Sequence, residues 1–340
     1  MPPTERRLGR LAVKALVAAI LVAVLCLAVD LEEAAAAVRG AHLLPLATAL
    51  AVSVLGVLIS AEKWRGLLHQ APIRLSLAVC TRLYWIGMFV SNFLPTSVGG
   101  DAVRFVLTPA PRRRAAVAGT ILVERLTGFL VMLGLCTLGL ALRPRYFDEP
   151  LLRGTFLAAV LVLQLGVMAA LLVPGRLAFL LTQLAERLPA ILRRLVEATA
   201  GVARAVAGLT RNPAGLARAM GLSICFYGTI ILAQHAVLRA VGAEVPLLEM
   251  ALVAAVIPLL TLLPVSLNGL GMAEGVFVLL YAQLGVDAEL ALAAAVLRRV
   301  VDLANSGLGG LLWLTLRDET GEAQPLVSST AAVRPSASVI

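Results

Sequence analysis

A glycine pair followed by an acid and a base interrupts an apolar stretch near residue 100. The run Gly99-Gly100-Asp101 is typical of a helix start, because glycine permits a sharp backbone turn and aspartate is a favoured N-cap. Arg104 falls in the first turn of the helix that would begin there. Helix N-terminal amides and arginine guanidiniums both bind oxyanions, so this pattern predicts a phosphate or carboxylate site. The alternative is that Asp101 and Arg104 pair and only hold the turn.

A second break of the same character lies at residues 263–271. Glu274 takes the first turn after it, either to stabilise the helix start or to carry protons. Polar and glycine residues beside the two breaks complete the predicted substrate site, and they are Asn92, Ser97, Ser266, Asn268, Gly269 and Gly271.

Further charged side chains lie inside apolar segments, where ionisable groups are costly and usually functional. They are Glu124, Arg125, Arg298, Arg299 and Asp302. We expect them to act in gating or coupling. An ion pair between Glu124 and Arg298 or Arg299 would be either a structural lock or a gate.

The composition requires a membrane environment for the elements that position these residues. Of 340 residues, 60% are hydrophobic and 14% charged, whereas soluble domains have about 45–50% apolar and about 25% charged residues. This excludes ordinary soluble enzymes. The net charge of +9 fits arginine-rich cytoplasmic loops better than nucleic-acid binding. The cysteines are scattered singly, so we expect no metal and no cofactor.

Hydropathy and loop charge together predict the path of the chain through the membrane. The predicted spans are residues 11–29, 43–61, 115–142, 155–173, 219–241 and 288–316. Basic residues concentrate in the loops that this path places inside, and both termini are then cytoplasmic. Residues 317–340 are expected to be a disordered cytoplasmic tail.

Two apolar stretches have ends of like charge and a break in the middle. Residues 77–108 have basic flanks at both ends, and residues 250–286 have acidic flanks at both ends. A single span would place one flank on the wrong side, so each stretch is predicted to be a re-entrant helical hairpin. Broken backbone is tolerated at membrane depth only where protein or a watery cavity satisfies it.

The order of these elements predicts an inverted-topology repeat within an all-α polytopic membrane protein. Residues 11–142 and 155–316 would form halves whose hairpins face opposite sides, an architecture that transporters use. Segment 174–218 would join them as a cytoplasmic amphipathic helix interrupted at Pro189. That segment either lies on the inner leaflet or packs against the protein.

Four motifs resemble the lysylphosphatidylglycerol synthase transmembrane-region family, also called flippase-like domain proteins. They are Asn92-Phe-Leu-Pro-Thr-Ser-Val-Gly-Gly-Asp-Ala-Val-Arg104, Val123-Glu-Arg-Leu-Thr-Gly128, Leu263-Pro-Val-Ser-Leu-Asn-Gly-Leu-Gly-Met-Ala-Glu-Gly275 and Glu62-Lys-Trp-Arg65. The resemblance implies a single flippase-like transmembrane domain over residues 1–316. Synthase activity in that family belongs to a soluble C-terminal aminoacyltransferase domain, and this sequence ends soon after the last span. We therefore expect no enzyme activity.

The resemblance implies that the protein moves an anionic phospholipid or lipid-linked precursor between leaflets of the cell (inner or plasma) membrane. The rival interpretation is a membrane scaffold or accessory subunit that holds a glycosyltransferase or another lipid-modifying enzyme as its partner. An intramembrane enzyme ranks last, because the sequence offers no metal cluster, nucleophile–base pair or paired carboxylates.

Overall fold

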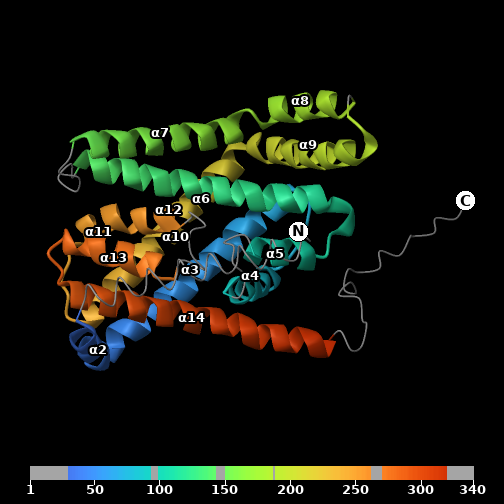
Figure 1. Cartoon of the computed structure of the whole chain (residues 1–340). Coiled ribbons are helices and arrows are strands. Elements are labelled where there is room, and N and C mark those ends of the chain that lie inside the picture. The colour runs from blue at the N-terminus through green and yellow to red at the C-terminus, as the bar shows by residue number, and fades with distance from the viewer. Residues whose placement is uncertain (1–29, 93–98, 143–149, 187, 262–269, 320–340) are drawn as a thin grey trace, which may run out of the picture.

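The computed structural model describes residues 30–92, 99–142, 150–186, 188–261 and 270–319, and within these ranges the secondary structure is entirely helical (Figure 1). The helices are α2 (Leu31–Arg39), α3 (Leu43–Gln70), α4 (Leu77–Ser91), α5 (Gly99–Leu107), the 3-10 turn η1 (Pro111–Arg113), α6 (Arg114–Leu142), α7 (Pro150–Leu172), α8 (Pro174–Glu186), α9 (Ala190–Thr210), α10 (Pro213–Ala240), α11 (Leu247–Ala254), α12 (Val256–Thr261), α13 (Met272–Ala282) and α14 (Ala288–Glu319).

Four helices in the described part of the chain are long and apolar enough to cross a membrane. They are α3, α6 with η1, α7 from Arg153, and α10, which agree with four of the predicted spans. The protein is therefore an all-helical membrane protein. Predicted span 288–316 is one continuous helix, α14, although it is not among those four. Predicted span 11–29 lies outside the described residues.

Helices α3 and α10 pack along each other at the centre of the molecule. They are antiparallel, since the amide of His42, just before α3, donates to the carbonyl of Ala240, the last residue of α10. In Figure 1, α6 and α7 lie on one side of this pair, with α8 and α9 at one end, and α14 lies on the other side.

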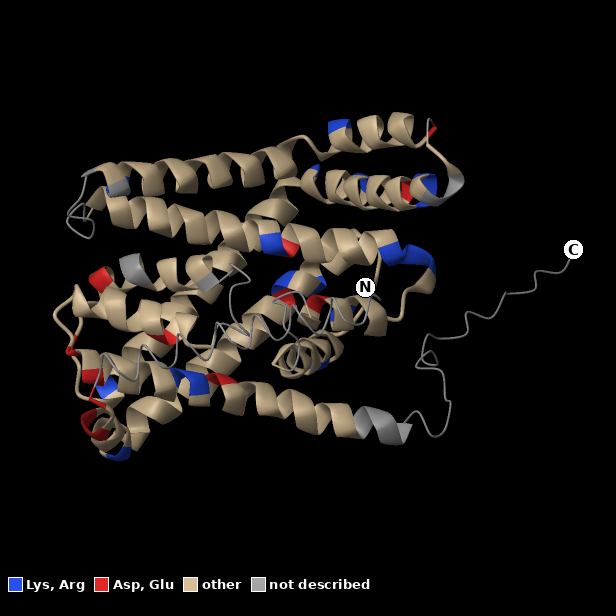
Figure 2. Ribbon diagram, viewed as in Figure 1, with Lys and Arg blue, Asp and Glu red and all other residues tan. Residues whose placement is uncertain are grey.

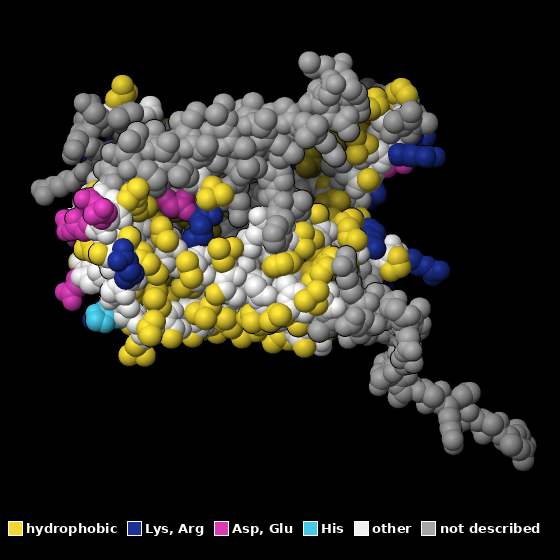
Figure 3. Space-filling view, turned by 60° about the horizontal axis from the view of Figure 1, so that its bottom comes forward, with side chains coloured by type: hydrophobic (Ala, Val, Ile, Leu, Met, Phe, Trp, Pro, Cys, Tyr) yellow, Lys and Arg dark blue, Asp and Glu magenta, His cyan; other side chains and the backbone are white. Residues whose placement is uncertain are grey.

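Charged residues gather at the two ends of the helix bundle and leave an apolar flank between them. Acidic residues lie at the end formed by α2 and the α13–α14 turn, and basic residues lie at the end formed by η1, α8 and α9 (Figure 2). Figure 3 shows hydrophobic side chains in a broad band between acidic and basic ends. Lipid chains would match this band.

The two stretches predicted as hairpins are each divided into short helices. Residues 77–107 form α4 and α5, and residues 247–282 form α11, α12 and α13. Each helix is shorter than the roughly 20 residues that a straight span needs. The described helices end at Ser91 and Thr261 and begin again at Gly99 and Met272. Residues 93–98 and 262–269, which hold most of the predicted break residues, lie outside the described part of the chain.

Helix α2 is an element that the hydropathy pattern misses. Its N-cap Asp30 accepts hydrogen bonds from the amides of Glu32 and Glu33, and Gly40 ends it. At the other end of the chain α14 continues to Glu319, so its last three residues correct the predicted start of the tail at residue 317.

The predicted amphipathic segment is a pair of helices that meet at Pro189. Helix α8 packs on α9, and α9 packs on α6. Packing against the protein is thus confirmed for α9. Helix α8 leaves Leu177, Phe179 and Leu180 more than half exposed, as a helix at a lipid surface would.

Candidate functional site

Helix α5 folds back against α4 through two glycines. A Cβ on Gly100 would lie 2.9 Å from the carbonyl oxygen of Gly87 and 2.8 Å from Ser91 Oγ, which is closer than real Cβ atoms approach. Only glycine therefore permits this contact. The close packing turns Asp101 and Arg104, on the first turns of α5, into the protein, where they are 8% and 5% exposed.

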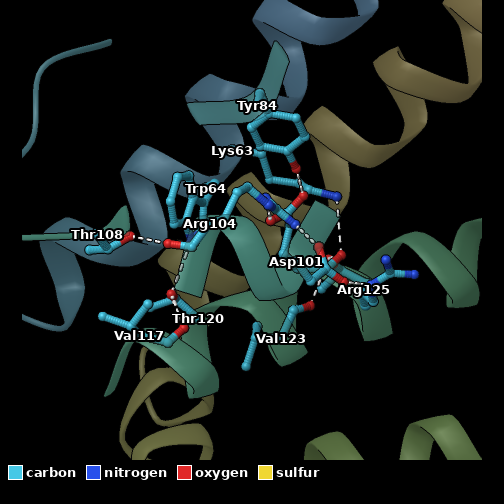
Figure 4. A network of polar contacts seen from close by, with 12 residues as sticks. Lys63, Trp64, Tyr84, Asp101, Arg104, Thr108, Val117, Thr120, Val123 and Arg125 are labelled. Atoms are coloured by element: carbon cyan, nitrogen blue, oxygen red, sulfur yellow. Dashed lines mark hydrogen bonds and ion pairs between the residues drawn. The ribbon is translucent and has the colours of Figure 1, made fainter. Parts of the chain in front are cut away.

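The Arg104 guanidinium bridges two buried carboxylates. It donates from Nη2 to Asp101 and from Nη1 to Glu124 Oε2, at 2.7 Å. It also lies over the rings of Tyr84 and Trp64, with its Cζ 4.1 Å and 5.0 Å from their centroids (Figure 4). The predicted Asp101–Arg104 pair is therefore present, as one part of a larger network.

Glu124 is the centre of that network. Its carboxylate accepts hydrogen bonds from Arg104 and from the Tyr84 hydroxyl. Its backbone carbonyl accepts a 3.1 Å hydrogen bond from Lys63 Nζ, which also donates to Ser223 Oγ at 3.1 Å. Helices α3, α4, α5, α6 and α10 thus each contribute a side chain.

The cluster holds one cation more than its carboxylates balance. Arg125 Nε donates to Asp101, so each arginine has a carboxylate partner. Lys63 contacts a carbonyl and a hydroxyl instead. With Lys63, Arg104 and Arg125 against Asp101 and Glu124, the charges sum to +1. We call these five residues the first cluster.

Lys63 corrects a prediction made from the charge pattern. Predicted span 43–61 ends before Lys63 and would leave it in a cytoplasmic loop, but α3 continues to Gln70 and leaves Lys63 5% exposed. Trp64, Tyr84 and Ser223 were also missed. Lys63 and Trp64 stand in the Glu62–Arg65 motif, which was the available signal.

A second group of charges lies in the other half of the chain. Glu274 Oε2 accepts a 2.8 Å hydrogen bond from the amide of Gly271, whose φ is +76°, and Glu274 Oε1 accepts one of 2.5 Å from Arg299. Arg298 pairs with Asp302 at 2.9 Å. Glu274 thus makes the helix-start contact that was one of the two alternatives for it. We call Glu274, Arg298, Arg299 and Asp302 the second cluster; its charges sum to zero.

The expected ion pair between the halves is not formed. Glu124 pairs with Arg104, and Arg299 pairs with Glu274. Other contacts connect the halves, namely the ion pair between Glu62 and Arg218 and neutral polar contacts from α4 to α14. Trp85 Nε1 donates to Asn305 Oδ1 at 3.0 Å, and Asn92 Nδ2 donates to Ser306 Oγ at 2.7 Å.

The remaining predicted site residues are only partly visible. Ser97, Ser266, Asn268 and Gly269 lie outside the described residues. Gly99 begins α5 and Gly271 precedes α13, as predicted. Within the described ranges there is no group of three or more His, Cys, Asp or Glu residues that could hold a metal ion.

A model of the family described as the lysylphosphatidylglycerol synthase TM region matches residues 11–309. The chain belongs to this family. The matched range includes both clusters and all four motifs from which the resemblance was inferred, so that prediction is confirmed. A search of the curated proteins finds no match.

Proposed function

We propose that this member of the lysylphosphatidylglycerol synthase transmembrane-region family moves an anionic lipid, either a phospholipid or a lipid-linked precursor, between the leaflets of the cell membrane. The proposal treats the chain as a transporter and not as an enzyme. It rests on the family membership and, above all, on the excess cation in the first cluster.

Burying a cation without a neutralising anion costs folding free energy, so such a cation is usually kept only where it has a function. Charged groups within a membrane domain are rare and mark substrate pathways. A phosphate about 4 Å from the Lys63 ammonium would gain about 4 kcal/mol at an effective dielectric constant of about 20. Arg104 cannot supply this attraction for a phosphate alone, because Asp101 and Glu124 already neutralise its charge. The phosphate of the lipid is therefore assigned to the side of the cluster that Lys63 provides.

Reciprocal packing supports an inverted repeat with two re-entrant hairpins. Helix α4 packs on α14, while α11 and α12, its counterparts, pack on α6. Likewise α3 packs on α14, while α10 packs on α6. The axis of the repeat would pass between α3 and α10. Rocking of the halves about this axis would open the first cluster to either leaflet, as in other inverted-repeat transporters.

The charge at the two ends supports one orientation in the membrane. The end formed by η1, α8 and α9 is rich in arginine, so it would face the cytoplasm. The acidic end would face outward. Both termini would then be cytoplasmic, and the chain would cross the membrane several times.

Transport is tested by flipping of a fluorescent lipid in vesicles that contain the purified protein. Labelled phosphatidylglycerol and phosphatidylcholine are compared for wild type, Lys63→Met and Arg193→Met. Arg193 is an exposed residue of α9 that pairs with Glu197, so Arg193→Met controls for the loss of one positive charge away from the cluster. We expect Lys63→Met to lose most phosphatidylglycerol flipping and Arg193→Met to retain it.

Equal flipping by all three proteins, or equal flipping of both lipids, would contradict the role assigned to the cluster. If the wild type flips neither lipid, the result favours the scaffold interpretation. It predicts instead that a glycosyltransferase or lipid-modifying enzyme copurifies with the chain and is still bound by Lys63→Met.

A further inference from the structure

A cavity of about 380 Å³ lies between the C-terminal end of α3 and the first turn of α10, outside the substrate site predicted from sequence. Small-molecule sites usually have volumes of about 300–1,000 Å³, so the cavity has room for a phosphate ester. The polar and charged residues among those that line it are Lys63, Arg65, His69, Gln70, Asn212 and Arg218.

The walls of this cavity are positively charged. Lys63, Arg65 and Arg218 line it, while the carboxylate that neutralises part of this charge belongs to Glu62, which is not a lining residue. Glu62 accepts from Arg65 at 2.7 Å and 2.9 Å and also from Arg218. Each guanidinium has five N–H donors, so this shared carboxylate positions both arginines and leaves them donors for an anion.

Lys63 joins the cavity to the first cluster. It is 5% exposed, lines the cavity, and uses two of its three ammonium hydrogens on Glu124 O and Ser223 Oγ. The charge that the cluster leaves unbalanced is therefore available at the wall of the cavity. This buried ammonium distinguishes the cavity from an ordinary solvated groove between helix ends.

The first turn of α10 adds the positive end of a helix dipole. Asn212 caps the helix by accepting from the amide of Gly215, and both residues line the cavity. Gln70 Oε1 is buried without a hydrogen-bond partner in the described structure. Gln70 Nε2 donates to the carbonyl of Gly66 at 3.5 Å, and the second hydrogen of that NH₂ can be donated to a bound anion.

We propose that this cavity is a second binding site, specific for a phosphate monoester or diester, at the basic end of the molecule. Arg65 and Arg218 hold the phosphate oxygens, Lys63 provides the buried charge, and the first turn of α10 completes the cradle. The phosphate comes either from a lipid headgroup or from a soluble ester. Binding here does not require that the chain transports lipid.

The test measures anion binding to the full-length protein in an uncharged detergent. Thermal unfolding is followed with inorganic phosphate, glycerol 1-phosphate or short-chain phosphatidylglycerol, each against chloride at equal ionic strength. Wild type is compared with Arg218→Gln and with Arg211→Gln. Arg211 is exposed, precedes α10 and does not line the cavity, so it controls for the loss of one positive charge near the start of α10.

We expect at least one phosphate compound to stabilise the wild type and Arg211→Gln. Arg218→Gln should bind it about tenfold or more weakly, since a charge-assisted contact is lost. Stabilisation by inorganic phosphate or glycerol 1-phosphate identifies a soluble ester as sufficient, and stabilisation by phosphatidylglycerol alone identifies a lipid headgroup.

The proposal is overturned if none of the three compounds stabilises the wild type, or if Arg218→Gln and Arg211→Gln respond alike. Arg218→Gln separates this result from the transport proposal, because Arg218 lines the cavity but does not belong to the first cluster, whereas Lys63 belongs to both. The cavity proposal does not require that Arg218→Gln loses flipping. A wild type that binds phosphate but does not flip lipid supports the cavity proposal and contradicts the transport proposal. Flipping without phosphate binding does the reverse.

Discussion

The two charge clusters follow the two predicted breaks in the same order along the chain but carry their charges in reverse. In the first cluster a base, Arg104, lies just after the helix break and pairs with an acid, Glu124, on the following long helix. In the second an acid, Glu274, lies after the break and pairs with a base, Arg299, on the following long helix. In both clusters an ion pair joins the short helix after the break to the following long helix, but the acid and the base exchange places.

The two clusters also differ in the burial of their ion pairs and in their net charge. The side chains of the Arg104–Glu124 pair are 6% and 7% exposed, and those of the corresponding Arg299–Glu274 pair are 28% and 11% exposed. The first cluster has a net charge of +1, and the second has none. The comparison supports the proposal that the first cluster receives an anion, while the contacts of the second fix the start of α13 to α14.

Removal of Arg104 should have the largest effect. Arg104→Ala leaves Asp101 and Glu124 buried without their shared partner, which typically costs about 3–5 kcal/mol of stability. We expect lower thermal stability in detergent and loss of flipping. Arg299→Ala should cost less in both measurements, because Arg299 is 28% exposed and Glu274 keeps its hydrogen bond from the Gly271 amide. Equal losses in the two variants would remove the distinction between the clusters.

Exchanging the acid and the base within each ion pair tests whether the order of the two charges matters for function. The double variant Arg104→Glu with Glu124→Arg keeps an ion pair but moves the guanidinium away from the rings of Trp64 and Tyr84, so flipping of phosphatidylglycerol should fall by about tenfold or more. The double variant Glu274→Arg with Arg299→Glu loses only the bond to the Gly271 amide and should retain most flipping. The opposite ranking would show that the second cluster holds the substrate.

The glycines after the breaks offer a comparison in stability. Gly100→Ala forces α5 away from Gly87 and should cost about 1–3 kcal/mol, as overpacking usually does. Gly275, next to Glu274 in α13, has open space around the position of a Cβ. Gly275→Ala should leave thermal unfolding within about 0.5 kcal/mol of wild type. Equal stability of the two variants would mean that α4 and α5 are not closely packed.

Substitution of Asp101 and of Asp302 should give the smallest difference in stability between the two clusters. Asp302→Asn removes one half-exposed partner of Arg298 and should change stability by less than about 1 kcal/mol. Asp101→Asn weakens contacts to both Arg104 and Arg125 inside the first cluster, so its thermal unfolding should shift further. A larger shift in Asp302→Asn would contradict the assigned burial.

Helix positions were largely predictable because hydropathy and glycine act locally. The predicted spans at 43–61, 115–142, 155–173 and 219–241 correspond to helices, and the interruption at Pro189 is present. Helix α2 was missed, although its N-cap Asp30 and the following acids were a readable signal. Local propensity was sufficient there, but the segment is too short and too polar for a hydropathy pattern.

The partners within the site were not predictable, because they come from distant parts of the chain. Glu124 meets Arg104 from α5, Tyr84 from α4 and Lys63 from α3, and no spacing rule relates these positions. Loop-charge counting placed Lys63 outside the membrane domain, because it assigns each base after an apolar run to the loop. The pairing of Glu274 with Gly271 was predictable, since a capping contact spans only three residues.

The most direct test of the excess cation is the lipid that copurifies with the protein. Lipids bound to wild type, Lys63→Met and Arg218→Gln are extracted and measured by mass spectrometry against the host membrane. If the first cluster holds a phosphate, an anionic lipid is enriched in wild type, retained at least in part in Arg218→Gln and lost in Lys63→Met. Lipid compositions that equal the host membrane in all three proteins would contradict the claim that this cluster binds an anionic lipid.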